Sequence, residues 1–167
     1  SSLTSIVIPD NVTTIGNSGF KSSGLTEITL GKGIKYIKDS AFYNTNIGSI
    51  IYRGNEKSWK SISFETIGND VLTKNPENIT YLVKSGDANG DGETSIADAV
   101  LIMQALSNSD EYSLSDIGEI NADVLDNDGV SSADALVIQM VVANTITSDV
   151  LPLTSEELAE LTTTAEE

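Results

Sequence analysis

Oxygen-bearing side chains recur at a fixed spacing in the segment from Asp87 to Asp98. They stand at positions 1, 3, 5, 9 and 12 of a twelve-residue stretch that has glycine at position 6, and the carbonyl of residue 7 supplies a further donor. Calcium takes about 6–8 oxygen ligands, and this is the spacing of a calcium-binding loop. Runs of Asp, Asn and Gly also form ordinary turns, but complete spacing before an apolar helix favours the ion. The expected ligands are Asp87, Asn89, Asp91, Glu93, Ser95 and Asp98.

The same stretch predicts the helix that follows it. Ser95 and Asp98 have the spacing of a capping pair, and residues 95–106 carry apolar side chains at helical intervals. Residues 131–142 repeat the pattern at an offset of 36. We therefore expect two helices that share a core, joined by a short capped helix within residues 113–120.

A second loop, from Asp123 to Asp134, precedes the second helix, but its inner positions differ. Leu125 stands at position 3, and glycine has moved to position 7. A bulged loop would still bind calcium through its two end carboxylates and an inner ligand, whereas the alternative is a loop that keeps its shape without metal or binds it weakly. We favour a second ion. The candidate ligands are Asp123, Asp126, Asn127, Asp128 and Asp134.

Charge divides the chain in two. Residues 1–84 contain all nine Lys and Arg and seven acidic residues, whereas residues 85–167 contain eighteen acidic residues and no basic one. This asymmetry predicts two modules, 1–84 and 85–149. No basic stripe is available for nucleic acid, and no apolar run approaches the length of a membrane span.

The acidic tail, residues 150–167, allows two interpretations. Thr154 or Ser155 would cap one or two helical turns that close on the termini of the module. Alternatively the tail is a solvated linker, which its composition slightly favours.

Residues 1–84 repeat every 22 residues. Each copy has a short stretch of alternating apolar residues, a turn and a second apolar pair. A period of this length predicts a solenoid in which neighbouring repeats must stack to bury their apolar edges. The five aligned columns are Leu3, Leu25 and Ile47; Ile6, Ile28 and Ile50; Ile8, Leu30 and Tyr52; Ile15, Ile37 and Trp59; and Phe20, Phe42 and Phe64.

The role of the solenoid is open between a binding surface and a spacer. Its other columns hold mainly Thr, Ser, Lys and Asn, with no row of aromatic side chains for stacking on sugars. Tyr36, Tyr43 and Tyr52 are candidates for contacts with a protein or glycan ligand, although aromatic residues at repeat spacing are more often core.

Two segments, 25–30 and 34–42, resemble the bacterial surface (BspA-type) leucine-rich repeats. Residues 50–59 resemble the closing repeat of that family, and residues 79–83 would form its last strand. The resemblance implies an extracellular protein, secreted or attached to the bacterial cell surface. We expect the chain to be a piece of a longer protein that continues upstream of Ser1.

The acidic half lacks room for a helix before its first loop, and a duplicated loop and exit helix without incoming helices resembles the type I dockerin. Residues 86–92 carry the resemblance, residues 121–124 and 132–136 support it, and it covers about residues 85–147. It is most similar to the divergent dockerins of ruminal anaerobes. The implied fold class is two domains, a short β-rich leucine-rich-repeat solenoid followed by a small all-α dockerin with duplicated F-hand calcium loops.

Dockerins are calcium-dependent modules that seat proteins onto cohesins of cellulosome-like scaffolds. The motif match implies a cohesin contact through exposed, largely apolar residues of the two helices, although a helical Met more often packs in a core. The two copies are nearly alike, which would allow two binding orientations related by a half turn. Ile96 in the first copy corresponds to Ser132 in the second, and this difference favours a single orientation. The implied partner-binding residues are Ile96, Ala97, Val100, Met103, Gln104, Ser132, Ala133, Leu136, Gln139 and Met140.

The sequence contains neither His nor Cys and no acidic pair suited to acid/base catalysis outside the loops. We expect a non-catalytic cellulosome-type component, linked to polysaccharide degradation, that binds two calcium ions and a scaffold cohesin. One alternative is a calcium sensor or buffer of the EF-hand kind. Another is the anchoring fragment of an enzyme that lies upstream of Ser1.

Overall fold

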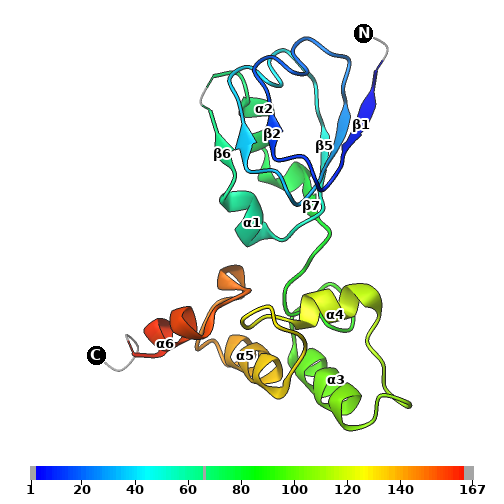
Figure 1. Ribbon diagram of the computed structural model, residues 1–167, viewed down its shortest axis with the longest axis vertical. Coiled ribbons are helices and arrows are strands. Elements are labelled where there is room, and N and C mark those ends of the chain that lie inside the picture. The colour runs from blue at the N-terminus through cyan, green and yellow to red at the C-terminus, as the bar shows by residue number, and fades with distance from the viewer. Residues whose placement is uncertain (1–2, 66, 164–167) are drawn as a thin grey trace. The chain divides into compact units, whose positions relative to one another are not determined.

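The computed structural model describes residues 3–65 and 67–163, and the chain forms two compact units, Ser1–Leu82 and Val83–Glu167 (Figure 1). Each unit has its own hydrophobic core. The predicted first domain begins with Ser1 and Ser2, and the predicted tail ends with residues 164–167; these positions lie outside the described residues. No helix in the described ranges is long and apolar enough to cross a membrane.

The N-terminal unit is a solenoid of two parallel sheets, as its 22-residue period predicts. In the four-stranded sheet, Ile6 is in register with Ile28, and Ile28 with Ile50, so the offset of 22 is confirmed there. The predicted last strand also forms and pairs with the third repeat. One sheet consists of β1 (Ser5–Ile8), β3 (Glu27–Leu30), β5 (Ser49–Tyr52) and β7 (Ile79–Tyr81), and the other of β2 (Thr14–Ile15), β4 (Tyr36–Ile37) and β6 (Ser63–Phe64).

The third repeat departs from the period, and two predicted columns are wrong there. Helix α1 (Glu56–Lys60) is inserted before β6, so Ile37 pairs with Phe64 rather than with Trp59. The helix begins because the side chain of Asn55 accepts a hydrogen bond from the Ser58 N–H at 2.9 Å. Trp59 instead packs on the Phe64 ring, with 5.5 Å between the ring centroids.

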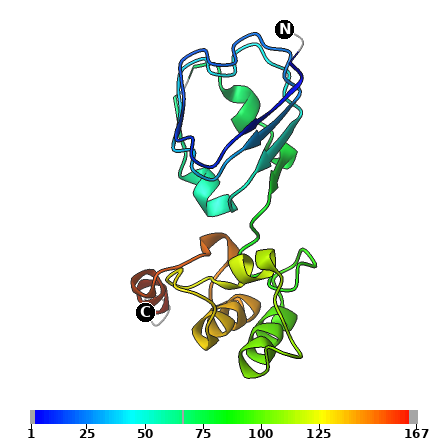
Figure 2. The same ribbon diagram turned by 45° about the vertical axis from the view of Figure 1, so that its right-hand side comes forward.

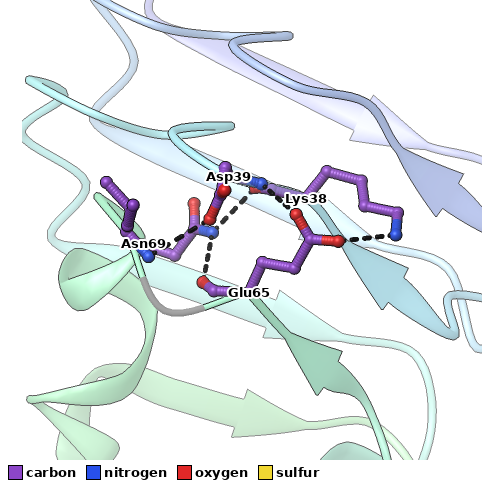
Figure 3. Close-up of polar contacts among 5 residues, drawn as sticks. Lys38, Asp39, Glu65 and Asn69 are labelled. Atoms are coloured by element: carbon purple, nitrogen blue, oxygen red, sulfur yellow. Dashed lines mark hydrogen bonds and ion pairs between the residues drawn. The ribbon is translucent and has the colours of Figure 1, made fainter.

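Polar side chains close the last turn of the solenoid, where no further repeat follows in the sheet β2-β4-β6. The buried amide of Asn69 accepts from the Phe42 N–H. It also donates to the carbonyls of Lys38 and Glu65 (Figure 3). Glu65 also forms an ion pair with the Lys38 ammonium at 2.6 Å. These bonds provide partners for backbone groups that the next repeat of a longer solenoid would otherwise bond to. Helix α2 (Asp70–Thr73) and the 3-10 turn η1 (Pro76–Asn78) follow.

The acidic unit is helical. Helices α3 (Ile96–Ser107) and α5 (Ser132–Val142) pack side by side (Figure 2), and α4 (Asp116–Ala122) links them, as the sequence predicts. Ile102 and Ile138, which occupy matching positions in the two copies, are both fully buried in the shared core. Residues 82–95 contain no helix, so the first loop follows directly on the connecting segment.

The start of the acidic tail belongs to the core. After the 3-10 turn η2 (Ser148–Val150), Leu151 and Leu153 are only 2% and 4% exposed, and helix α6 (Ser155–Thr163) follows. The prediction of a solvated linker is therefore wrong for these residues. It was based on the polar composition of the tail as a whole, which does not reveal that two of its leucines pack in the core.

Candidate functional site

Loop 1 (residues 87–98) is closed by the carboxylates at its two ends. Asp87 Oδ2 accepts from the Gly92 N–H at 3.0 Å, and Gly92 has a φ of +95°, which glycine adopts without strain. Asp98 accepts from the N–H groups of Asn89, at 3.0 Å, and Ser95, at 2.8 Å. Both end carboxylates are therefore buried at the centre of the loop, with Asp87 3% and Asp98 0% exposed.

Asp98 also caps helix α3, of which it is the third residue. Its bond from the Ser95 N–H, together with the bond from the Ala97 N–H to the Ser95 hydroxyl, forms the predicted capping box. Ser131 and Asp134 form the same box at the start of α5. The residue that closes each loop thus also fixes the start of the helix that follows.

One oxygen of loop 1 is left without a partner. Asp87 Oδ1 is buried and accepts no hydrogen bond within the described residues. A buried carboxylate oxygen without a partner is costly, and a bound cation is a common means of compensating it. The other candidate ligands of the loop are carboxylate, amide, hydroxyl and carbonyl oxygens, which are the ligands that calcium prefers. Loop 1 therefore fits a calcium ion.

The inner residues of loop 1 are exposed and bond within the loop. Asn89 Oδ1 accepts from the Asp91 N–H at 2.8 Å, and Asp91 Oδ1 accepts from the Glu93 N–H at 2.9 Å. Within residues 3–65 and 67–163, no group of three or more Asp, Glu, His or Cys side chains is arranged to hold a metal ion. These bonds instead hold the inner side chains of Asn89 and Asp91 against the loop's own backbone.

Helix α4 supports loop 1 through a residue that we did not single out as a site residue. The buried Asn121 side chain donates to the Asp87 carbonyl at 2.9 Å and accepts from the Lys84 N–H at 3.0 Å. The Asn121 carbonyl also accepts from the Gly86 N–H at 2.7 Å. Gly118 lies so close to the Ala88 carbonyl that a Cβ there would approach its oxygen to 2.5 Å. These bonds fix the backbone on both sides of Asp87.

Loop 2 (residues 123–134) has the same end carboxylates. Asp123 Oδ2 accepts from the Gly129 N–H at 3.1 Å, and Asp123 Oδ1 is buried without a partner in the part of the chain described. Asp134 accepts from the backbone N–H groups of Val124 and Leu125, each at 2.8 Å. The pattern of bonded and unpartnered oxygens thus matches that of loop 1.

The charges in loop 2 are unbalanced. Burial raises the pKa of the Asp123 carboxyl above its ordinary value, and the nearby carboxylates of Asp134 and Asp128 raise it further, although the Gly129 N–H opposes them. A cation beside these groups would reverse both effects of burial and repulsion. Loop 2 therefore also fits a cation. Its Asp126 and Asn127 have positive φ angles of +60° and +53°, which form the bulge that the moved glycine predicts.

Eight of the ten predicted partner-binding residues are exposed on α3 and α5. On α3, Ile96, Val100 and Met103 are 53%, 48% and 45% exposed and form an apolar stripe along one face. Gln104 is half-buried. Met140 is also half-buried and packs against the core, so the core alternative is correct for this methionine but not for Met103.

An open groove of about 500 Å³ runs beside this stripe. Val100, Met103 and Gln104 line it from α3, Gln139 lines it from α5, and Tyr112 lines it from the segment after α3. Tyr112 was not predicted, because it lies outside both repeats of the loop-and-helix pattern. The groove adds an aromatic side chain to the apolar face of α3.

The solenoid also exposes two aromatic side chains. Tyr36 and Tyr43 are 48% and 51% exposed, whereas Tyr52 is fully buried, so the core interpretation is correct only for Tyr52. The ammonium of Lys38 lies 5.5 Å from the Tyr36 ring centroid, and that of Lys21 lies 5.3 Å from the Tyr43 ring centroid. Each exposed ring is thus paired with a cation.

Comparisons with known proteins gave two kinds of result. No curated protein matches it. Among solved structures, one titled "R. flavefaciens' third ScaB cohesin in complex with a group 1 dockerin" is 46% identical over 37% of this chain and 90% of that chain, with a TM-score of 0.35. A TM-score this low carries no structural argument.

The N-terminal unit has a clear relationship. The family model for the BspA type leucine rich repeat region matches residues 1–85, in six copies. This match covers just over half of the 167 residues and includes both sheets of the solenoid. The chain therefore belongs to the BspA type leucine rich repeat family.

Proposed function

We propose that the acidic unit is a type I-like dockerin that binds calcium in both loops and docks onto a cohesin module of a scaffold protein. The solenoid is then a neighbouring recognition or spacer module. In this role the protein is a non-catalytic, extracellular component of a cellulosome-type assembly for polysaccharide degradation. The observation that carries the proposal is that the loop suited to calcium also caps the helix that presents the apolar stripe.

Calcium has a structural role in this proposal. In loop 1 the ion would be held by the oxygens of Asp87, Asn89, Asp91, Ser95 and Asp98 and by the Glu93 carbonyl. It compensates the unpartnered Asp87 oxygen and the charge of a segment that has no basic residue after Lys84. Because it binds only the folded loop, it stabilises the unit by RT ln(1 + [Ca]/Kd).

The partner surface proposed is the stripe of Ile96, Val100 and Met103 with the adjoining groove at Tyr112. Three exposed apolar side chains on one helix face are unusual in so charged a unit, and clusters of this kind mark protein interfaces. The polar lining of the groove, Gln104 and Gln139, supplies hydrogen-bonding groups at its rim. The cohesin contact is therefore apolar at its centre.

We favour a single orientation, with α3 rather than α5 against the cohesin. At an offset of 36, the residues of α5 that match the α3 stripe are Ser132, Leu136 and Gln139. Only Leu136 is apolar and exposed among these three. A half-turn of the unit would therefore offer the partner a much more polar face.

The solenoid has features of a recognition surface as well as of a spacer. Exposed Tyr36 and Tyr43, each beside a lysine, are side chains suited to a protein or glycan ligand. A calcium sensor or buffer of the EF-hand kind is disfavoured, since the described residues before loop 1 contain no incoming helix that calcium could move.

Calorimetric titration against a panel of cohesins, in calcium and then in EDTA, tests the proposal. The expected result is tight binding to at least one cohesin that is lost in EDTA. If calcium binds tightly but no cohesin does, the dockerin assignment is wrong. A calcium-stabilised recognition protein, or a sensor, would then be the better account.

A further inference from the structure

The C-terminal segment, residues 151–158, lies along loop 2. The Leu153 N–H donates to the Val124 carbonyl at 2.8 Å, and the Asp126 N–H donates to the Leu153 carbonyl at 2.8 Å. Leu125 and Leu153 thereby form a parallel β-bridge. Because Leu151 and Leu153 are buried in the core of the unit, the segment is an integral part of the loop's surroundings.

Both carboxylate oxygens of Asp126 are engaged by this segment. Asp126 Oδ1 accepts from the Ser155 N–H at 2.7 Å, and Asp126 Oδ2 accepts from the Ser155 hydroxyl. Ser155 is the first residue of α6, so the carboxylate also lies at the positive end of that helix. Asp126 therefore already has two strong partners.

In each loop, one glycine N–H donates to the carboxylate of the first residue, and these two glycines show which residues of the loops correspond. The Gly92 N–H bonds to Asp87 in loop 1, and the Gly129 N–H bonds to Asp123 in loop 2. Aligned on these glycines, the preceding residue in loop 2 is Asp128, which then takes the place of Asp91. Asp128 is also one of the charges that act on Asp123. Loop 2 has one residue more than loop 1 before this glycine, in the bulge at Asp126 and Asn127, and one fewer after it.

We propose that loop 2 divides its inner acids between two tasks: Asp126 anchors the C-terminal segment through Ser155, and Asp128 serves as the inner carboxylate ligand of the cation. The proposal rests on the second calcium ion of the proposed function and is independent of any cohesin. It also implies that the C-terminal segment and the ion stabilise the same conformation of the loop. Docking of residues 151–158 and calcium binding in loop 2 are then positively linked.

Calcium calorimetry on the full chain tests this assignment with the matched variants Asp126→Asn and Asp128→Asn, with loop 1 as the internal reference. Wild type should bind two ions. Asp128→Asn should weaken the second site by at least about tenfold, since even the loss of a residue that only orients a ligand costs that much. Asp126→Asn should weaken it less and should increase hydrogen exchange at residues 153–158.

The variant Ser155→Ala separates the two roles of Asp126. If Asp126 acts through Ser155, then Ser155→Ala weakens the second site in the same direction as Asp126→Asn but by less, because the Ser155 N–H bond to Asp126 remains, and it has little further effect in the Asp126→Asn background. If Asp126→Asn weakens the second site as much as Asp128→Asn while Ser155→Ala leaves it unchanged, Asp126 is a ligand and the proposal is overturned. A single ion bound by wild type would refute the second site, and this assignment with it, while leaving loop 1 and the cohesin contact intact.

Discussion

The two copies of the loop and helix have the same local chemistry but different support. Loop 1 is held by α4, whose Asn121 bonds to the backbone on both sides of Asp87. Loop 2 is held by the C-terminal segment, through Leu153 and Ser155. Capping boxes and end carboxylates are the same in both. The repeat therefore encodes the loop ends and the helix starts, whereas a different element packs outside each loop and, in loop 2, engages an inner carboxylate.

The outward faces of α3 and α5 also differ. Ile102 and Ile138 are equivalent and equally buried, so the inward faces of α3 and α5 are conserved between the copies. The outward faces have diverged, with Met103 on α3 opposite Gln139 on α5. An internal duplication can thus keep a symmetric core and lose a symmetric surface. Four experiments test how far the two copies differ, in order of decreasing expected effect.

Removal of calcium should have the largest effect. With calcium at about a hundredfold excess over Kd, one site contributes about 2.7 kcal/mol, which lowers the Tm of a unit of this size by about 10–20 °C when EDTA is added. Scanning calorimetry should show this shift in the acidic unit only. The transition of the solenoid, which has no such loop, is the internal control. Equal shifts in both transitions, or none, would contradict the calcium assignment.

A charge on α3 should weaken cohesin binding strongly, and the same charge on α5 should not. Met103→Asp places a carboxylate at the C-terminal end of the apolar stripe, where Met103 also lines the groove, and loss of a hot spot costs about 2 kcal/mol or about 30-fold in affinity. Leu136→Asp is the matched control on α5, since Leu136 is also exposed. Titration with a cohesin that binds the wild type measures both. Comparable losses would show that both helices contact the partner.

Asn121→Ala should weaken calcium binding in loop 1 selectively. It removes the bonds to the Lys84 N–H and the Asp87 carbonyl, and the loss of such orienting contacts typically costs about tenfold in metal affinity. Calcium calorimetry measures the two sites, with loop 2 expected to keep its affinity. Ile120→Ala, at an exposed neighbour on α4, is the control. An equal loss at both sites would mean that the loops are not separately supported.

The smallest effects should come from the two caps, and they should be nearly equal. Ser95→Ala and Ser131→Ala each remove the hydroxyl that accepts the helix N–H groups of Ala97 or Ala133, at a cost of about 1 kcal/mol. Melting in EDTA compares the caps without the ion. A difference much larger than this cost would show that the two helix starts are not equivalent.

Much of this architecture was predictable because it depends on local spacing. The period of 22 residues gave the register of β1, β3 and β5, and the pairs Ser95–Asp98 and Ser131–Asp134 gave both helix starts. In each case the interacting groups are close in sequence or repeat at a constant offset. The prediction failed at Trp59, where an inserted helix adds five residues to the third repeat and shifts the pairing.

Long-range contacts account for what the sequence did not reveal. By spacing alone, Asp126 is a candidate ligand of the cation. The structure instead shows its carboxylate bonded to Ser155, which lies 29 residues further along the chain. Tyr112 joins the groove although it lies in an irregular segment with no repeat to mark it. The exposure of Met103 and the partial burial of Met140 depend on the packing of α3 against α5, which helical spacing in each copy does not define.

The two methionines provide the most direct test of the central claim, that calcium presents the α3 face to a cohesin. Only Met103 and Met140 are present in the chain, so a sample with ¹³C-labelled methionine methyl groups gives two well-defined NMR signals. On addition of a tightly binding cohesin in calcium, we expect the Met103 signal to shift and the Met140 signal to stay, and neither to change in EDTA. Tight binding that leaves Met103 unchanged, or that persists unaltered in EDTA, would contradict the account.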